Sequence, residues 1–309
     1  MKLSIVTTLY KSSAYINEFY ERISTEANKI TTDYEIIFVD DGSPDDSLQK
    51  TIKLHHKDSK VKVIELSRNF GHHKAIMTGL SHAKGEYVFL IDSDLEEEPE
   101  LLGKFWEELQ KEKDLDVVYG VQETRKGGWF EKVSGDIFYK TFNFFSGVQI
   151  PKNFLTIRLM TKNYVSNLIN FQEKEVIFSI LTVLAGFNTK KFTIKKLSHS
   201  PTTYSTINKF KLLFKAIIAS SPKPLWLAFN FGLIITLSSI FYIFYLSYRK
   251  FIHGVGIDGW TSVMVSISFF GGLIIFFLGI IGIYLAEVFI EVKNRPFTIV
   301  KKIHKLEEK

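Results

Sequence analysis

The sequence predicts an α/β protein in which a mostly parallel sheet domain is followed by interfacial helices and two transmembrane helices. Two observations lead to this fold class. Between Leu3 and Val121, short apolar runs rich in β-branched residues alternate with amphipathic segments, which is typical of parallel strands joined by helices. Further along, two apolar stretches are each long enough to cross a hydrocarbon core, which takes roughly 20 apolar residues.

The elements of the first part follow from this alternation. The expected strands are Leu3–Leu9, Glu35–Val39, Val61–Leu66, Tyr87–Ile91 and Val117–Val121. The expected helices lie near Ser13–Asn28, Ser47–His56, His72–His82 and Pro99–Lys111. The pattern defines a fold class and by itself leaves the function open.

Composition narrows the set of partners. The formal net charge of +6 favours anionic partners such as phospholipid or nucleotide phosphates. The alternating region between Leu3 and Val121 holds no basic run interleaved with aromatic residues, so we expect no nucleic-acid partner. The chain has no cysteine, which excludes disulfides, thiolate catalysis and cysteine-ligated metal. The N-terminus runs directly into a strand-like stretch and is no signal peptide, so we expect the first domain in the cytoplasm.

The apolar stretches Leu225–Tyr248 and Val263–Val288 predict a transmembrane hairpin. Basic residues are frequent before the first stretch and after the second, whereas only Arg249 and Lys250 lie between them. The positive-inside rule therefore places both flanks on the cytoplasmic side, as in a multi-pass protein of the inner (cytoplasmic) membrane. A core hairpin of a soluble protein is the alternative.

Two further stretches combine aromatic residues with lysines. Gly127–Gly147 is either an interfacial helix or a helix packed on the sheet, and Asn208–Ile218 is expected at the membrane surface because it leads into the first span. The expected domains are an α/β domain over 1–205, an interfacial amphipathic helix over 206–224, a transmembrane hairpin over 225–288 and a basic cytoplasmic tail over 289–309. Close-packing spacings within the second span are compatible with a homo-oligomer. They occur among Gly271, Gly272, Gly279 and Gly282.

Asp92 and Asp94 follow directly after the apolar strand Tyr87–Ile91. Ligands of open α/β sheets gather at the carboxyl ends of the strands, so both carboxylates are expected in a binding site. A second Asp-x-Asp, formed by Asp114 and Asp116, precedes its strand, and we interpret it as a solvated turn. Paired carboxylates suit a hard cation that keeps open positions for substrate phosphates. We therefore predict Mg²⁺ or Mn²⁺ at Asp92 and Asp94.

Several short motifs follow one another in a distinctive order. They are Ile36-Ile37-Phe38-Val39-Asp40-Asp41-Gly42-Ser43, Leu66-Ser67-Arg68-Asn69-Phe70-Gly71, Asp92-Ser93-Asp94-Leu95 with Pro99-Glu100, Val117-Val118-Tyr119-Gly120-Val121, Arg158-Leu159-Met160, Gly279-Ile280-Ile281-Gly282 with Tyr284-Leu285, and Glu291-Val292-Lys293 with Arg295-Pro296. Together with the paired spans, this order resembles the membrane-anchored polyprenyl-phosphate glycosyltransferases of family 2, which have the GT-A (Rossmann-like) fold. That group includes phage serotype-conversion bactoprenol glucosyltransferases and dolichol-phosphate-mannose synthases. The resemblance runs from about Leu3 to Val300.

The resemblance implies an inverting transfer of a hexosyl group from a UDP-sugar to a polyprenyl (undecaprenyl) phosphate, for synthesis of a cell-surface glycan. It also implies that Asp40 or Asp41 accepts a hydrogen bond from uracil, with Thr8 and Tyr10 nearby. Gly42 would allow the tight turn that brings the backbone close to a ligand. An ordinary Asp-Gly turn is the alternative for this stretch.

Cationic and catalytic candidates complete the expected site. Arg68, and Arg125 with Lys126, are candidates for pyrophosphate contacts, because charge-assisted donors suit phosphate oxygens. Each of these side chains taken alone is better explained as a solvent-facing charge. The resemblance implies catalytic roles for Asp94 and Arg158. The adjacent His72 and His73 at a helix start point in different directions, so we do not expect a metal there.

The chain departs from the family pattern at the acceptor side. An acidic residue usually lies two positions before the arginine of Arg-Leu-Met, and Thr156 stands there instead. The usual Gly-Lys-Ser-Lys-Tyr loop reads Ser200-Pro201-Thr202-Thr203-Tyr204, so both lysines are replaced, and Arg158, Lys190 or Lys195 would have to compensate. The usual Pro-x-Tyr-Asn-Glu after the first strand reads Thr8-Leu9-Tyr10-Lys11-Ser12. A phosphate acceptor tolerates the loss of the carboxylate better than a hydroxyl acceptor does.

Two other functions stay open. One is a transferase of the same fold that acts on a different lipid or a lipid-linked glycan. The other is a catalytically weak membrane scaffold that binds a nucleotide-sugar or partner proteins, against which the intact Asp92 and Asp94 pair argues. The sequence does not identify the sugar.

Overall fold

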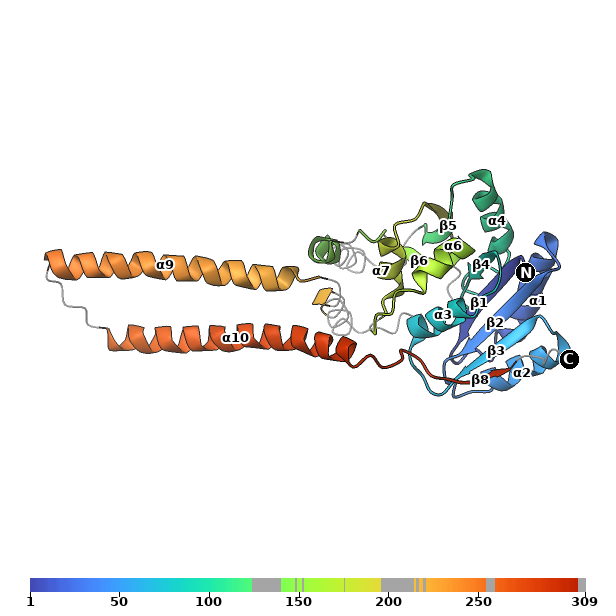
Figure 1. The fold of residues 1–309 in the computed structure, drawn as a ribbon, viewed down its shortest axis with the longest axis horizontal. Helices are drawn as coiled ribbons and strands as arrows, with labels where there is room; N and C mark the ends of the chain where they lie inside the picture. Colours follow the sequence, from blue (N-terminus) through green and yellow to red (C-terminus); the bar gives the residue numbers. More distant parts are fainter. Residues whose placement is uncertain are drawn as a thin grey trace. The chain divides into compact units, whose positions relative to one another are not determined.

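The computed structural model describes residues 1–123, 140–147, 149–151, 153–174, 176–195, 214, 217–218, 221–253 and 259–304 (Figure 1). The chain divides into two compact units. The first comprises Met1–Asn143, Val148–Ser205 and Arg295–Lys309, and the second comprises Phe144–Gly147 and Thr206–Asn294. Arg125, Lys126, the 200–204 loop and most of the expected interfacial stretches lie outside the described residues.

The first unit is built on an 8-stranded sheet with the order β7-β5-β6-β4-β1-β2-β3-β8. The strands are β1 (Leu3–Leu9), β2 (Tyr34–Asp40), β3 (Val61–Leu66), β4 (Tyr87–Leu90), β5 (Val117–Gln122), β6 (Phe154–Thr161), β7 (Thr189–Ile194) and β8 (Val300–His304). The neighbours β4, β1, β2 and β3 are parallel, as are β5 and β7, whereas β6 and β8 run antiparallel to their neighbours. The expected mostly parallel sheet is confirmed, and β1 and β3 have the expected bounds.

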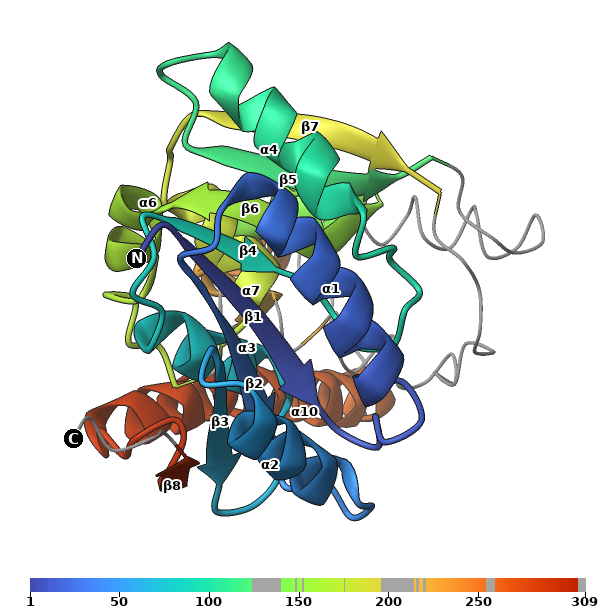
Figure 2. The same ribbon diagram turned by 90° about the vertical axis from the view of Figure 1, so that its right-hand side faces the viewer.

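Helices cover both faces of this sheet (Figure 2). One face carries α1 (Ile16–Ile30), α2 (Ser47–Lys57) and α4 (Leu101–Lys111), and the other carries α3 (His72–Ser81), α6 (Lys162–Leu168) and α7 (Phe178–Leu184). The strands serve both cores by alternation, because successive side chains of a strand point to opposite faces. In β1, Leu3 and Ile5 enter the first core and Val6 enters the second.

The last described segment of the chain returns to the sheet. β8 pairs antiparallel with β3, and the Ser67 amide donates to the Ile299 carbonyl at 2.9 Å. Glu65 accepts a hydrogen bond from Lys301 Nζ, and the Thr78 and Thr298 hydroxyls are hydrogen-bonded at 2.8 Å. We expected only a basic tail over 289–309, whereas part of this segment is a strand of the 8-stranded sheet.

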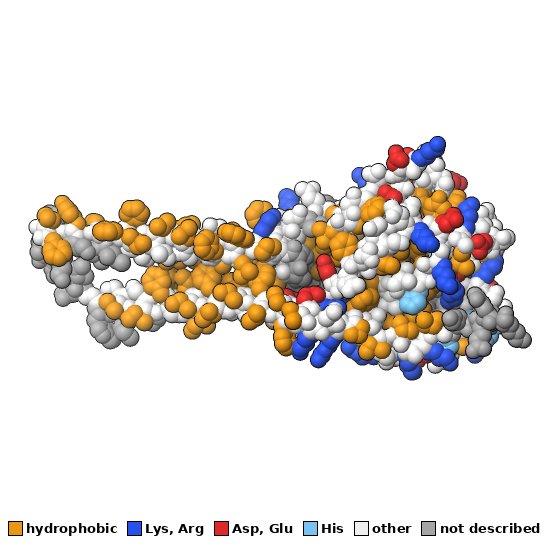
Figure 3. Space-filling view, viewed as in Figure 1, with side chains coloured by type: hydrophobic (Ala, Val, Ile, Leu, Met, Phe, Trp, Pro, Cys, Tyr) orange, Lys and Arg blue, Asp and Glu red, His pale blue; other side chains and the backbone are white. Residues whose placement is uncertain are grey.

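The second unit contains two long helices, α9 (Lys223–His253) and α10 (Trp260–Val292). Both are long and apolar enough to cross a membrane, and none of either apolar window is buried inside the protein (Figure 3). The expected spans lie inside these helices. Apart from the adjoining turns of the helix itself, a Cβ added at any of the four glycines of α10 would meet no atom of the described residues within 4 Å. The homo-oligomer stays a prediction.

Candidate functional site

The carboxyl edge of the sheet brings the expected site residues together. Thr8 lies near the end of β1, Asp40 ends β2, and Asp92 follows shortly after β4. These three strands are parallel neighbours, so their carboxyl ends meet at one edge, where α/β proteins bind ligands. Arg68 follows β3 at the same edge, and the antiparallel β6 brings Arg158 opposite Leu90. Arg125 lies outside the described residues.

The two adjacent aspartates after β2 have different environments. The Asp41 carboxylate accepts hydrogen bonds from the backbone amides of Phe70 at 2.7 Å and Gly71 at 3.0 Å. Asp40 Oδ2 accepts a long hydrogen bond from the Ser43 amide, at 3.3 Å, and Asp40 Oδ1 is buried without a hydrogen-bond partner among the described residues. Burial raises the pKa of both carboxyls. Asp41 therefore fixes the 70–71 turn, and Asp40 presents an unused acceptor.

The turn that follows is held tightly against the next loop. Gly42 has a φ of +65°, and a Cβ there would lie 2.6 Å from the Asn69 amide nitrogen. Glycine is therefore required both for the left-handed backbone and for the close approach of the two loops. Arg68 leaves this loop exposed, with its guanidinium 4.3 Å from the centre of the Phe70 ring.

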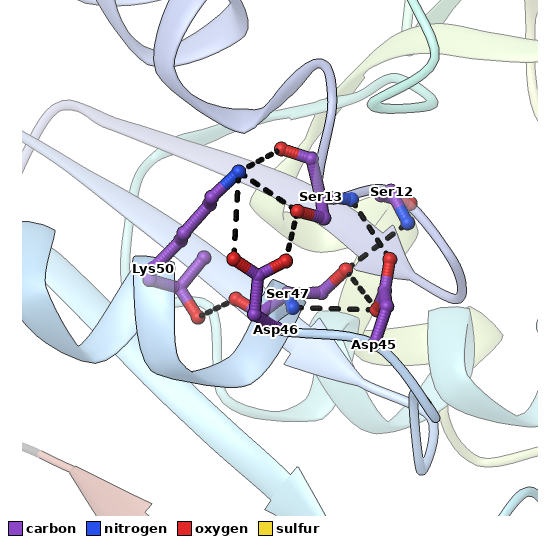
Figure 4. Close-up of polar contacts among 7 residues, drawn as sticks. Ser12, Ser13, Asp45, Asp46, Ser47 and Lys50 are labelled. Atoms are coloured by element: carbon purple, nitrogen blue, oxygen red, sulfur yellow. Dashed lines mark hydrogen bonds and ion pairs between the residues drawn. The ribbon is translucent and has the colours of Figure 1, made fainter.

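A polar network joins the loop after β1 to the start of α2 (Figure 4). The Ser12 amide donates to Ser47 Oγ at 3.0 Å, and the Ser13 amide donates to Asp45 Oδ2 at 3.2 Å. Lys50 Nζ donates to the Ser13 carbonyl at 2.9 Å. These bonds hold the backbone that carries Tyr10, whose side chain is 49% exposed at the edge. No motif in the sequence indicated this network.

Asp92 and Asp94 extend from the loop after β4. Ser93 between them is buried, and its hydroxyl donates to the Thr8 carbonyl at 3.0 Å, which ties this loop to β1. Asp94 Oδ1 accepts from the Glu96 amide at 3.0 Å. The described residues contain no cluster of three or more His, Cys, Asp or Glu side chains that could hold an ion. Two carboxylate groups fit a Mg²⁺ or Mn²⁺ ion that takes its remaining ligands from substrate phosphates and water.

His72, for which we expected no metal-site role, lies beside Thr8 and Asp92. Its Nδ1 is 3.0 Å from Thr8 Oγ1, and its Nε2 is 3.5 Å from Asp92 Oδ1. The next residue turns away as expected, because His73 Nδ1 lies 3.2 Å from the Val176 carbonyl oxygen. Burial lowers the pKa of His73. The signal in the sequence was the position of His72, directly after the turn that follows β3.

Arg158 is buried, with 1% of its surface exposed. Its Nε and Nη2 donate to the carbonyls of Thr156 at 2.9 Å and Leu155 at 3.0 Å, and its guanidinium lies 4.8 Å and 4.5 Å from the ring centres of Phe154 and Phe178. Burial lowers the pKa of Arg158 to about 10. The side chain lines a cavity of about 180 Å³ and braces the backbone of β6. Its expected catalytic role stays a prediction.

Two other expectations concern the opposite edge of the sheet. Asp114 and Asp116 lie at the amino end of β5, as their reading as a turn requires, and Asp114 lines a cavity of about 560 Å³ there. Lys190, a candidate to replace the missing loop lysines, also lies at this edge and pairs with Glu112 at 2.6 Å and Glu108 at 3.2 Å. Lys190 therefore does not compensate at the carboxyl edge.

Comparison with known proteins defines the class. A Mycobacterium tuberculosis (strain CDC 1551 / Oshkosh) protein described as a glycosyltransferase is 45% identical over 304 residues, which is 98% of this chain and 89% of the relative. The SfII prophage-derived bactoprenol glucosyl transferase of Shigella flexneri is 29% identical over 308 residues, which is 99% of both chains. Glucosyl-3-phosphoglycerate synthase from Mycobacterium tuberculosis, solved in complex with UDP, has a TM-score of 0.50 at 16% identity and covers 72% of this chain and 81% of that one.

The fold and these relatives define an enzyme with a GT-A-like α/β fold that transfers glycosyl groups. The chain belongs to glycosyl transferase family 2, whose model matches residues 4–169. The matched segment contains the ends of β1, β2, β3 and β4, with every described residue of the candidate site.

Proposed function

We propose that this chain is a metal-dependent, inverting glycosyltransferase that moves a hexosyl group from a UDP-sugar to a polyprenyl phosphate. The proposed UDP-sugar donor rests on Asp40 Oδ1 at the carboxyl edge of the sheet. This atom is buried and has no hydrogen-bond partner among the described residues. A buried acceptor without a partner is costly, and a ligand that donates a hydrogen bond removes that cost. The acceptor half rests on relatives named as bactoprenol glucosyl transferases.

Uracil suits the Asp40 position because its N3–H is a hydrogen-bond donor that Oδ1 would accept. Tyr10 is exposed beside this edge and would pack on the base, and Arg68 would donate to the diphosphate. The structural neighbour solved with UDP has the same fold, which supports a uridine nucleotide here. Thr8, whose hydroxyl lies 3.0 Å from His72 Nδ1, would lie near the nucleotide.

Asp92 and Asp94 would hold Mg²⁺ or Mn²⁺, which stabilises the charge on the departing nucleotide diphosphate. The two carboxylates lie on a short loop that Ser93 anchors to β1, so they reach the site from a rigid strand end. A loop fixed in this way keeps both carboxylates on the side of the sheet edge that faces the donor. Asp94 has the catalytic role in this proposal because its loss would leave the diphosphate without a cation.

The acceptor nucleophile would be a phosphate oxygen. A phosphomonoester has a second pKa of about 6, so it is largely ionised near neutral pH and needs no general base. Thr156 is consistent with such an acceptor, because a base at that position is dispensable. The helices α9 and α10 would hold the chain in the bilayer in which a polyprenyl lipid lies, with the first unit on the cytoplasmic side.

A second candidate has the same donor and a different acceptor, either another lipid or a lipid-linked glycan. It is favoured by one observation: Lys190 is engaged at the opposite edge of the sheet and cannot replace the lysines missing from the 200–204 loop. Under this alternative the donor residues keep their roles, and only the lipid product changes.

The test is turnover by the full chain in detergent, with Mn²⁺ or Mg²⁺, undecaprenyl phosphate and a panel of UDP-sugars. Mass spectrometry of the lipid fraction should show one new lipid-linked sugar, and the Asp94→Asn variant should lack it. Hydrolysis of a UDP-sugar without a lipid product would contradict the polyprenyl-phosphate acceptor and favour the second candidate.

A further inference from the structure

The His72 ring links the ends of two neighbouring strands at the proposed metal site. Its Nδ1 lies 3.0 Å from Thr8 Oγ1, at the end of β1, and its Nε2 lies 3.5 Å from Asp92 Oδ1, after β4. A neutral imidazole meets both groups when Thr8 donates to Nδ1 and the Nε2 proton faces the carboxylate. The ring therefore spans from the β1 hydroxyl to one of the two carboxylates.

The backbone just before His72 is held by the Asp41 carboxylate. His72 is the first residue of α3, and the amides of Phe70 and Gly71 just before it are both bound by the buried Asp41 carboxylate. The His73 side chain points elsewhere, to the Val176 carbonyl. The position of the His72 ring is thus set by the start of the helix and by Thr8.

The two carboxylates differ in what orients them. Asp94 accepts a hydrogen bond from the amide of Glu96 in its own loop. For Asp92, the His72 ring is the neighbouring polar side chain that the described part of the chain provides, with Nε2 3.5 Å from Oδ1. The Nε2–Oδ1 distance of 3.5 Å is slightly longer than a hydrogen bond, so a small shift of either side chain would bring the two atoms within hydrogen-bonding distance. Side chains that orient a ligating carboxylate typically change metal affinity 10- to 100-fold.

We infer that His72 is a positioning residue of the metal site, which holds the Asp92 carboxylate in the orientation that binds the cation. This inference rests on the metal dependence of the proposed function. The His72 side chain is 43% exposed, and within the described residues it contacts Thr8, Asp92 and the ring of His73.

The experiment measures Mn²⁺ binding to the full chain in detergent with saturating UDP, from the EPR signal of the free ion. His72→Ala should raise the Mn²⁺ dissociation constant about 10- to 100-fold. The matched surface control is His56→Ala, which removes an exposed histidine from α2 and should bind like the wild type. Thermal unfolding without metal should be the same for His72→Ala and the wild type.

Two conservative variants separate positioning from general stabilisation. His72→Gln reaches about as far as Nε2 and can still donate to Asp92, so it should retain most of the Mn²⁺ affinity. His72→Asn reaches only about as far as Nδ1, keeps the contact with Thr8, and should behave like His72→Ala. Wild-type affinity in His72→Ala, or equal losses in the Gln and Asn variants, would overturn the inference.

The Asp94→Asn variant separates this inference from the proposed function. If the wild type binds Mn²⁺ no better than Asp94→Asn, the metal site itself is wrong and both ideas fail. If the wild type binds Mn²⁺, Asp94→Asn does not, and His72→Ala matches the wild type, only the role of His72 is wrong.

Discussion

Substitution by asparagine should lower the stability of the fold at Asp41 and weaken donor binding at the adjacent Asp40. In Asp41→Asn, the amide has one acceptor for the two backbone N–H groups of Phe70 and Gly71, and its own NH₂ faces the second. A hydrogen bond to a charged group is worth about 1.5–3 kcal/mol, and a buried donor left unpaired adds a desolvation cost. We expect Asp41→Asn to lower the stability of the first unit by about 2–4 kcal/mol.

Asp40→Asn should leave the fold intact and weaken donor binding. Burial raises the pKa of Asp40, so replacing its carboxylate by a neutral amide of the same shape removes an unfavourable buried charge. The amide must use its oxygen either for the Ser43 amide or for uracil, which costs one charge-assisted hydrogen bond. A loss of about 1.5–3 kcal/mol corresponds to about a 10- to 150-fold weaker UDP affinity.

The assay compares both variants with the wild type by thermal unfolding without nucleotide and by calorimetric UDP titration with Mn²⁺. The titration is meaningful for Asp41→Asn only below its unfolding temperature. The reasoning is refuted if Asp41→Asn unfolds at the wild-type temperature, or if Asp40→Asn binds UDP as tightly as the wild type. A reversed pattern, with Asp40→Asn the less stable variant, would exchange the two roles.

Three further substitutions test other parts of the account. Gly42→Ala should destabilise the first unit in thermal unfolding, because the added Cβ would meet the Asn69 backbone at 2.6 Å at a φ of +65°. Burial pushes the pKa of Glu65 upward, but hydrogen bonds from Lys301 and His304 outweigh it and hold that pKa below its ordinary value of 4.5. The pairing of β8 with β3 should therefore be stable at neutral pH and weaken as the pH falls through the lowered pKa of Glu65. Glu65→Gln should speed amide hydrogen exchange of β8 at neutral pH, and unchanged exchange would contradict this role. Arg158→Lys should lower stability by about 1–3 kcal/mol, since an ammonium lacks the fork that reaches both carbonyls; wild-type unfolding would argue against a bracing role.

The sequence predicted best where local pattern and position carry the information. Continuous β-branched runs gave β1 and β3 their observed bounds, because buried parallel strands read as apolar runs. The rule that ligands gather at strand ends predicted Asp92 and Asp94 at the carboxyl edge of the sheet, where the structure has them, and the structure has Asp114 and Asp116 at the amino end of β5. Metal binding by Asp92 and Asp94 stays a prediction.

Features that depend on partners distant in sequence were missed. The strand β8 reads as a basic tail, because Lys301 and Lys302 interrupt its apolar positions, and only pairing with β3 makes it a strand. The edge strand β7 likewise alternates exposed polar residues with partly or fully buried ones, and two adjacent lysines, Lys190 and Lys191, interrupt the apolar pattern. Asp40 and Asp41 were left as alternatives because their difference comes from the 70–71 turn, about thirty residues later in the chain. The bridging position of His72 has the same origin, since Thr8 and Asp92 come from two other strands.

The central claim is that the acceptor is the phosphate of a polyprenyl lipid. The most direct measurement gives the full chain, in lipid nanodiscs, its best UDP-sugar with either undecaprenyl phosphate or undecaprenol, and follows the glycolipid by mass spectrometry. The account predicts a product with the phosphate and none with the alcohol, because no general base stands where Thr156 replaces the usual acidic residue. A product formed on undecaprenol at a similar rate would contradict it.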